Sequence, residues 1–173
     1  MSCDNKKYSH KVNEYVTYGQ NGICQIIDIQ KQKIKGIERT YYIMKSVYNN
    51  TKIMVPVDSD MLVGNMRHIL SEKEILDIIK KSEDSDNIWM QDTKLRSEQL
   101  EKMLHNGDRA DILWIVKMLS MYKLQAEKEG KRFYASDERI LYTAEKIITE
   151  EFAFALGIER NEVIPYITAH INN

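Results

Sequence analysis

Side chains that could bind a metal or act as nucleophiles are few and widely separated in this sequence. The 173 residues contain four histidines and two cysteines, none of them in a C-x-x-C pair or a similar metal-ligand spacing: Cys3, His10, Cys24, His68, His105 and His170. Zinc sites combine several such ligands at short, recurring spacings. The sequence therefore predicts no metal site and offers no pattern that would hold another cofactor.

Motifs of phosphate-binding and hydrolytic enzymes are also missing from the sequence. Gly130-Lys131-Arg132 resembles the end of a phosphate-binding loop, but the glycine and strand that precede such a loop are absent. Carboxylate pairs occur at Asp137-Glu138 and Glu150-Glu151, where a helix start or a solvent-facing surface is the expected setting. Without clustered titratable groups, the sequence predicts a protein that is not an enzyme.

The composition is that of a protein that can form a hydrophobic core and carries little net charge. Hydrophobic residues make up 43% of the chain, and 25 Lys and Arg face 26 Asp and Glu. No stretch approaches the ~18 apolar residues that a membrane span needs. The polar N-terminus has no signal-peptide core, and two scattered cysteines suit a reducing compartment. These features predict a cytoplasmic location without membrane attachment.

The first third of the chain has the pattern of short β-strands. β-Branched and aromatic residues alternate with polar ones, and the segments are separated by turn residues such as Gly22, Gly36 and Asn50. Pro56 suits an edge strand or a strand end. The expected strands cover residues 12–18, 23–30, 39–47 and 51–57. Four or five short strands joined by tight turns predict a small, strongly bent sheet or barrel.

From about residue 60 the apolar residues repeat with the period of a helix. Ser71 and Glu74 form a capping-box pattern, Gly107 suits a left-handed helix end, and Asp108 and Ser136 are expected N-caps. Glu151 falls in register with the apolar face of its helix. After a helix that begins at Ser71 and a polar linker at 82–87, the expected helices cover 88–105, 108–129, 136–156 and 159–171, the last interrupted by Pro165. The predicted class is α+β, a β module followed by a compact all-α domain of about five helices.

Charge is divided unevenly between these two halves. Residues 83–173 hold 12 basic and 17 acidic side chains, a net of −5, whereas the first 82 residues hold 13 basic and 9 acidic ones, a net of +4. Neither half has the strong basic bias of a protein that depends on phosphate contacts alone.

The order of several short motifs resembles a known family. The first part of the chain resembles the N-terminal module of CarD/CdnL-type bacterial transcription regulators. The motifs that carry this resemblance are, in order, Val12-Asn13-Glu14-Tyr15-Val16-Thr17-Tyr18, Gly22, Ile34-Lys35-Gly36, Arg39-Thr40-Tyr41-Tyr42-Ile43-Met44-Lys45 and Met54-Val55-Pro56. Transcription-repair coupling factors share that module, but no helicase motor fits in this chain. Leu100-Glu101-Lys102-Met103-Leu104, Asn106-Gly107-Asp108, Ser136-Asp137-Glu138-Arg139 and Ala144-Glu145-Lys146-Ile147-Ile148 resemble the helical module of these regulators.

The resemblance implies two domains with different partners. Residues 1–66 are expected to form a Tudor-like small barrel that docks on the β-subunit lobe of RNA polymerase. Residues 67–173 are expected to form a helical domain that contacts promoter DNA at the upstream edge of the melted region. Such a protein acts as a monomer in the cytoplasm, associated with the nucleoid through the polymerase, and wedges a Trp into the minor groove.

The docking strand implied by the resemblance is Lys52-Ile53-Met54-Val55-Pro56. Ile53 and Val55 have the same parity, which differs from that of Lys52 and Met54, so the two sets face opposite sides of a regular strand. Ile53 and Val55 are either barrel core or docking contacts. Lys52 and Met54 are the better candidates for side-chain contact with the polymerase.

Trp89 is the candidate for the minor-groove wedge, although its position differs from that of the relatives. The equivalent of their Trp is Thr93, four residues or about one helical turn later. Trp89 therefore serves the same groove after a small shift, or it anchors a helix start on the β module. Trp114 lies among apolar residues of the central helix and is expected in the core.

Basic residues near Trp89 and near the next inter-helix loop are the candidate phosphate contacts. The alternative for each is an ordinary solvated helix face, and nearby acidic residues dilute the loop cluster. The candidates are Lys94, Arg96, Lys102, Lys131, Arg132 and Arg139.

Two functions follow from this set of features. The first is a non-sigma transcription regulator that binds RNA polymerase and stabilises the promoter open complex. The second is a protein adaptor that docks on the polymerase and recruits another protein without contacting DNA, a version that the acidic helical half favours.

Overall fold

The computed structural model describes residues 8–171 and separates into two compact units, Met1–Ile69 and Leu70–Asn173. The first is called here the sheet unit and the second the helical unit. Their net charges, counted over these bounds, are +4 and −5. None of the described helices is both long enough and apolar enough to cross a bilayer.

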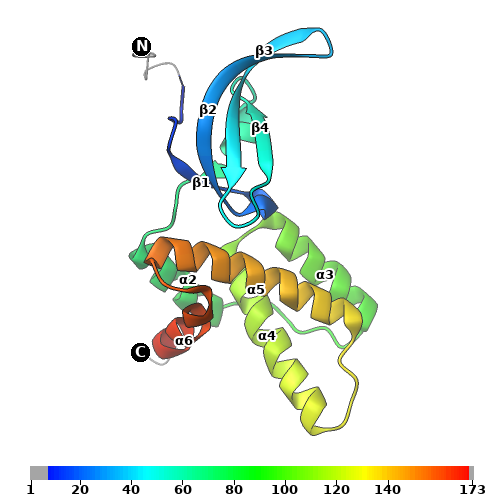
Figure 1. The fold of residues 1–173 in the computed structure, drawn as a ribbon. Helices are drawn as coiled ribbons and strands as arrows, with labels where there is room; N and C mark the ends of the chain where they lie inside the picture. Colours follow the sequence, from blue (N-terminus) through cyan, green and yellow to red (C-terminus); the bar gives the residue numbers. More distant parts are fainter. Residues whose placement is uncertain (1–7, 172–173) are drawn as a thin grey trace. The chain divides into compact units, whose positions relative to one another are not determined.

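The sheet unit is built on one five-stranded antiparallel sheet (Figure 1). Along the sheet the strands follow the order β4-β3-β2-β1-β5, so that β4 and β5 are its edges. A short helix, α1 (Asp60–Gly64), precedes the last strand. The strands are β1 (Tyr15–Tyr18), β2 (Ile23–Ile34), β3 (Ile37–Ser46), β4 (Lys52–Pro56) and β5 (Met66–Arg67).

A β-bulge between Ile26 and Asp28 interrupts the pairing of β2 with β3. Such a bulge bends the strand and increases its twist, and Figure 1 shows β2 strongly curved. The bend lets all five strands contribute to a single small core, made of Val16, Cys24, Ile26, Tyr42, Met44, Val55 and Met66. The expected strongly bent sheet is confirmed.

The β2–β3 hairpin is longer than the sequence pattern indicates. β2 continues to Ile34 and β3 begins at Ile37, which leaves Lys35 and Gly36 as a two-residue turn. Both turn residues have positive φ, 50° for Lys35 and 84° for Gly36. Positive φ at both central positions is the signature of a type I′ turn, whose twist matches that of a hairpin.

Up to residue 171, the helical unit contains five helices: α2 (Glu72–Glu83), α3 (Thr93–Asn106), α4 (Arg109–Lys128), α5 (Ala135–Leu156) and α6 (Arg160–Ile171). α5 packs against α3, α4 and α6, and α2 packs against α4 and α6. Ile115, Leu119, Ile148 and Phe152 lie at the centre of the core. Trp114 is buried in the same core, which confirms its expected position. The α+β class with about five helices in the second half is confirmed.

Most helix ends follow the expected chemistry. Ser71 and Glu74 form the predicted capping box, Gly107 has a φ of 75° at the end of α3, and the Asp108 carboxylate accepts from the Ala110 and Asp111 amides. Two expectations are wrong, one about a helix start and one about an interruption of a helix. The third long helix begins at Ala135, with Tyr134 and not Ser136 at the N-cap. α6 runs through Pro165 without interruption.

The third correction concerns the helix expected at 88–105. α3 begins only at Thr93, because the Asp92 carboxylate caps it by accepting from the Leu95 amide at 2.9 Å. Residues 88–92 therefore form a non-helical approach to the helix, with bends at residues 91 and 92. Trp89 belongs to this approach and not to the helix, so it does not sit one helical turn before Thr93.

Candidate functional site

The edge strand β4 is the candidate docking element of the sheet unit. It pairs with β3 along one side, with Met54 opposite Ile43 and Val55 opposite Tyr42. Within residues 8–171 no strand pairs with its other side. Backbone N–H and C=O groups on that side can extend the sheet by pairing with a strand from a partner.

Side chains of β4 divide between the core and the opposite face. Val55 is fully buried in the core of the sheet unit, and Ile53 packs against that core. Val55 thus belongs to the core alternative, whereas Ile53 is half-buried, as Met54 is. Lys52 is exposed. Lys52 and Met54 have the parity opposite to that of the core residue Val55 and stay the better candidates for side-chain contact, and Pro56 ends the strand.

Trp89 is held inside the helical unit by its neighbours. Its ring lies 5.0 Å from that of Tyr122, centroid to centroid, and the Arg96 guanidinium carbon lies 4.7 Å from the Trp89 centroid. The indole is half-buried and packs against the helical core. Cation–π and aromatic contacts of this kind fix a ring in one orientation. Trp89 is therefore a fixed aromatic side chain that stays partly exposed.

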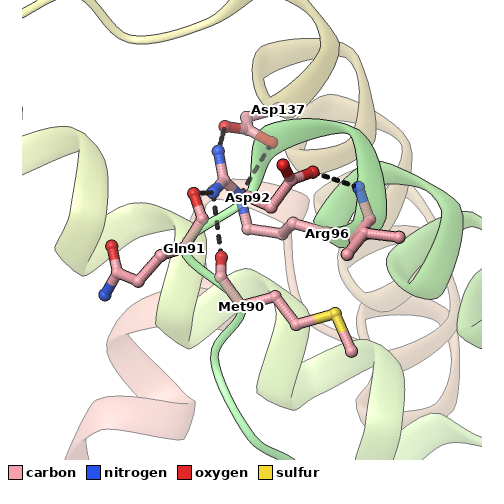
Figure 2. A network of polar contacts seen from close by, with 6 residues as sticks. Met90, Gln91, Asp92, Arg96 and Asp137 are labelled. Carbon is pink, nitrogen blue, oxygen red and sulfur yellow. Dashed lines mark hydrogen bonds and ion pairs between the residues drawn. The ribbon is translucent and has the colours of Figure 1, made fainter.

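Arg96 organises this region, as Figure 2 shows. Its Nη2 and Nε donate to the two carboxylate oxygens of Asp137 at 2.6 and 3.3 Å. Its Nη1 donates to the backbone carbonyls of Met90 and Gln91 at 3.0 and 3.2 Å. The Arg96 guanidinium thereby links residues 88–92, called here the Trp89 segment, to α5.

Burial of this ion pair corrects the sequence-based expectation for Arg96. Arg96 is 2% exposed and Asp137 0%, and a buried charge is tolerated when an opposite charge and hydrogen bonds satisfy it. The structure therefore gives Arg96 a role inside the helical unit in place of the phosphate contact expected from the sequence. Asp137 and Glu138 lie in the first turn of α5, the helix-start setting that the sequence predicts, with Asp137 buried against Arg96 and Glu138 exposed.

A second buried ion pair joins α4 to α5. The Arg109 Nε donates to the Glu151 carboxylate, and its Nη1 donates to the Gly107 carbonyl at 2.8 Å. Glu150, also buried, accepts from the Arg160 guanidinium at 3.1 Å. The expectation of a solvent-facing Glu150-Glu151 pair is wrong. The apolar register of Glu151 was the available signal, since an acid on a buried face needs a cation beside it.

The other predicted phosphate contacts lie on the surface, and two of them pair with acids. Arg139 Nη2 lies 2.5 Å from a Glu101 carboxylate oxygen, and Lys131 Nζ lies 2.6 Å from one of Glu129. The hydrogen bond and charge of Lys131 lower the pKa of Glu129, and Glu129 raises the pKa of Lys131. Lys94 and Lys102 lie exposed on α3, and Arg132 is exposed in the α4–α5 loop.

A groove of about 640 Å³ lies beside Trp89 along the second half of α4. Met121 and Leu124, each 57% exposed, contribute much of its apolar wall. Lys128 and Lys131 lie among its other lining residues. In the described part of the chain, no group of three or more His, Cys, Asp and Glu residues could hold a metal ion.

Comparison with known families identifies the sheet unit. Residues 10–70 match the family model of the CarD-like/TRCF RID domain, the N-terminal RNA polymerase-interacting module. The match spans all five strands and ends where the helical unit begins. No curated protein matches the chain.

Proposed function

We propose that this chain, which carries a CarD-like/TRCF RID domain at residues 10–70, is a non-sigma transcription regulator that stabilises the promoter open complex. Such domains are typical of non-catalytic regulators of transcription. The proposal places a monomer in the cytoplasm, docked on the β-subunit lobe of RNA polymerase. The family match of the sheet unit is the observation that carries the proposal.

Docking is proposed to occur through the free edge of β4. The open backbone edge supplies main-chain pairing with a strand of the polymerase. Lys52 and Met54 supply side-chain contacts, because Ile53 and Val55 are engaged by the core of the sheet unit. A Glu at position 54 would place a charge in the contact without disturbing that core.

Capture of RNA polymerase by the immobilised full chain tests the docking step. Met54→Glu is expected to lower capture by roughly tenfold or more, as truncation of a central interface residue does. Met121→Glu makes the same substitution on the exposed face of α4 and should leave capture unchanged. Equal capture by the wild-type chain and Met54→Glu would remove β4 as the docking element, and no capture by the wild-type chain would overturn the proposed function.

Contact with DNA is proposed to involve Trp89 and the exposed cations around it. Support comes from the fixed ring of Trp89, because a preorganised side chain loses little conformational entropy on binding. Lys94, Lys102, Lys131, Arg132 and Arg139 are the proposed phosphate contacts. The ion pairs of Lys131 and Arg139 are exposed, so a phosphate can replace their carboxylate partners with little loss of free energy.

An adaptor without a DNA role is the second candidate function. The −5 charge of the helical unit and the apolar groove beside Trp89 favour a protein partner there. The lifetime of the promoter open complex separates the two functions. Trp89→Ala should shorten that lifetime about tenfold or more if Trp89 wedges a base step, while polymerase capture is retained.

A matched aromatic substitution completes this comparison. Tyr142 is 68% exposed on α5, so Tyr142→Ala removes an aromatic ring from the same unit without touching the Trp89 contacts. The regulator hypothesis expects a normal open-complex lifetime for Tyr142→Ala. An unchanged lifetime with Trp89→Ala, at full polymerase capture, would favour the adaptor.

A further inference from the structure

The β2–β3 hairpin projects as a two-stranded ribbon beyond the rest of its sheet (Figure 1). β1 pairs with β2 only at residues 23–25, and β4 pairs with β3 only at residues 41–45. At the Lys31–Thr40 pair the Thr40 carbonyl still accepts from the Val57 amide at 3.0 Å. From the Gln32–Arg39 pair to the Ile34–Ile37 pair, β2 and β3 pair with each other alone among the described strands. This segment, residues 31–40, is called here the ribbon.

The ribbon is basic and fully open to solvent near its tip. It carries Lys31, Lys33, Lys35 and Arg39 against the single acid Glu38, a net of +3. Every residue from 33 to 39 is exposed. The ribbon thus holds most of the +4 net charge of the sheet unit on one thin projection.

An apolar pair caps this basic projection. Ile34 and Ile37 lie directly opposite each other, next to the turn, and are 42% and 59% exposed. Two exposed isoleucines at an unprotected hairpin end favour aggregation unless a partner covers them. The flanking lysines indicate the charge of that partner, which must be anionic.

The turn itself holds a cation in an unfavourable backbone conformation. Lys35 has a φ of 50°, where Asn, Asp or Gly is usual in a type I′ turn because a longer side chain is strained there. Strained backbone tends to occur at functional positions. A lysine at this position puts an ammonium group at the foremost point of the ribbon.

The dimensions of the ribbon suit the major groove of duplex DNA. Two residue steps of about 3.4 Å separate the Gln32 pair from the Ile34 pair, giving about 7 Å of free paired ribbon before the turn, against a groove depth of about 8.5 Å. A two-stranded ribbon enters a major groove about 12 Å wide, whereas the minor groove is about half as wide.

The two faces of the ribbon would then meet the two walls of the groove. Lys31 and Lys33 share one parity of β2 and face one side. Gln32 lies opposite Arg39 on the other side. Arg39 forms an exposed ion pair, 3.8 Å from an Asp58 carboxylate oxygen, which a phosphate can replace. Tip-first entry places Ile34 and Ile37 toward the base edges, where apolar side chains contact the thymine methyl group.

We propose that the ribbon of the sheet unit is a duplex-DNA contact, distinct from the helical unit and independent of polymerase docking. Its lysines and Arg39 contact phosphates on both sides of the major groove, and its isoleucine tip contacts base edges. With at most four phosphate contacts, binding to free duplex is weak and steeply dependent on salt, with a slope of log K against log salt of up to about −3.6.

Fluorescence anisotropy of a labelled duplex of about two helical turns, titrated with the full chain at several low salt concentrations, tests this inference. Lys31→Gln/Lys33→Gln/Lys35→Gln should weaken binding roughly tenfold or more and flatten the salt slope by about 0.9 for each phosphate that is no longer neutralised. Lys73→Gln/Lys80→Gln/Lys146→Gln removes the same charge from exposed positions of the helical unit and should change affinity less than about twofold.

Two further variants separate the alternatives. Ile34→Ser/Ile37→Ser should lower affinity while the salt slope stays the same, because it removes apolar contacts and no charge. Met54→Glu should leave duplex affinity unchanged, so that a loss of polymerase docking can be distinguished from a loss of duplex binding by the ribbon. Absence of duplex binding by the wild-type chain at low salt, or equally weakened binding in the two lysine triple variants, would overturn the inference. Impaired polymerase capture with unchanged duplex affinity in the ribbon variants would also overturn it and would mark an acidic protein surface as the partner.

Discussion

The two units of this chain hold their polar groups in opposite ways. In the described part of the sheet unit the buried polar residues are Thr17 and Ser46, neither of them charged. Among its described residues the helical unit buries five charged ones, Arg96, Arg109, Asp137, Glu150 and Glu151. The basic unit therefore keeps its charge on its surface, where it can meet a partner, whereas the acidic unit uses part of its charge to fix its own helices.

This difference shows when a charge count can reveal a binding surface. Net charge predicts long-range attraction only if the charged groups are exposed. In the helical unit Arg96 is engaged in an internal pair, and Lys131 and Arg139 are paired with neighbouring acids. In the sheet unit four exposed cations lie on the ribbon, and of these Arg39 pairs with the exposed Asp58. The more basic candidate surface is therefore on the unit for which the sequence predicts only protein contacts.

The largest effect is expected from breaking the Arg96–Asp137 pair. Asp137→Asn leaves the buried guanidinium without an opposite charge, which should lower the free energy of unfolding of the helical unit by about 3–5 kcal/mol. Trp89 and Trp114 are the two tryptophans of the chain and both lie in this unit. Urea unfolding followed by tryptophan fluorescence therefore reports on the helical unit alone.

The neighbouring Glu138 provides the control for this prediction. Its side chain is 64% exposed and pairs with Lys123 at 3.5 Å, so Glu138→Gln should change stability by less than about 1 kcal/mol. An Arg96→Met/Asp137→Leu chain should be more stable than Asp137→Asn, because an apolar pair carries no unmatched charge. A destabilisation of under about 1 kcal/mol with Asp137→Asn would mean that the charge pair does not hold the Trp89 segment.

A smaller and opposite effect is expected in the sheet unit. Lys35→Asn should relieve the backbone strain of the positive φ and stabilise the sheet unit by roughly 1 kcal/mol, since Asn-Gly suits a type I′ turn. The same change should weaken duplex binding and flatten the salt slope by about 0.9. Thermal unfolding by circular dichroism and duplex anisotropy measure the two effects.

Lys33→Asn is the matched control, because it removes the same charge two residues earlier in the ribbon. Lys33 lies in β2 with ordinary strand geometry, and Asn is unfavourable in strands. Lys33→Asn should therefore weaken duplex binding without any gain in stability. If Lys35→Asn destabilises the sheet unit instead, contacts of the Lys35 side chain outweigh the strain of its backbone. That strain would then give no support to the proposed role of the ribbon.

Local signals in the sequence are sufficient for most of the fold. Ser71 and Glu74, Gly107 and Asp108 define helix ends through contacts within a few residues, so the sequence predicts them correctly. The sequence also places the β2–β3 turn near Gly36, but the lengths of the strands depend on cross-strand pairing that periodicity does not contain. The predicted start of α3 is wrong because Trp89 and Met90 fit an apolar helix face, whereas the Asp92 cap starts the helix at Thr93.

The candidate site is less accessible to sequence reasoning. Arg96 and Asp137 are 41 residues apart in the chain, and no spacing rule connects them. Arg96 also follows Trp89 and Lys94 in what the sequence presents as a basic helix face, so a phosphate contact is the natural prediction. Burial decides between the two roles, and burial depends on how α3 packs on α5. Glu151 is the exception, since its place in an apolar register indicates a buried acid in advance.

The smallest expected effect is an alkaline sensitivity confined to the sheet unit. Burial raises the pKa of the Cys24 thiol from 9.0 to about 11. Burial, and in second place the nearby Cys24, also raises the pKa of Tyr18. A thiol whose pKa is higher in the folded state holds its proton while the unfolded thiol ionises. The stability of the sheet unit should therefore fall as the pH rises from about 9 toward about 11.

Cys24→Ala separates this contribution from the titration of the exposed lysines and tyrosines. Its own stability at about pH 8 will be lower, because the thiol is fully buried and its removal leaves a small cavity. The fall in stability between about pH 8 and about pH 10.5 should nevertheless be smaller than in the wild-type chain. Urea midpoints from far-UV circular dichroism measure that difference, with tryptophan fluorescence of the helical unit as the internal reference. A fall of equal size in both chains would show that the Cys24 thiol ionises as freely in the folded sheet unit as in the unfolded chain. The contrast between an uncharged interior of the sheet unit and a charged interior of the helical unit would then rest on the helical unit alone.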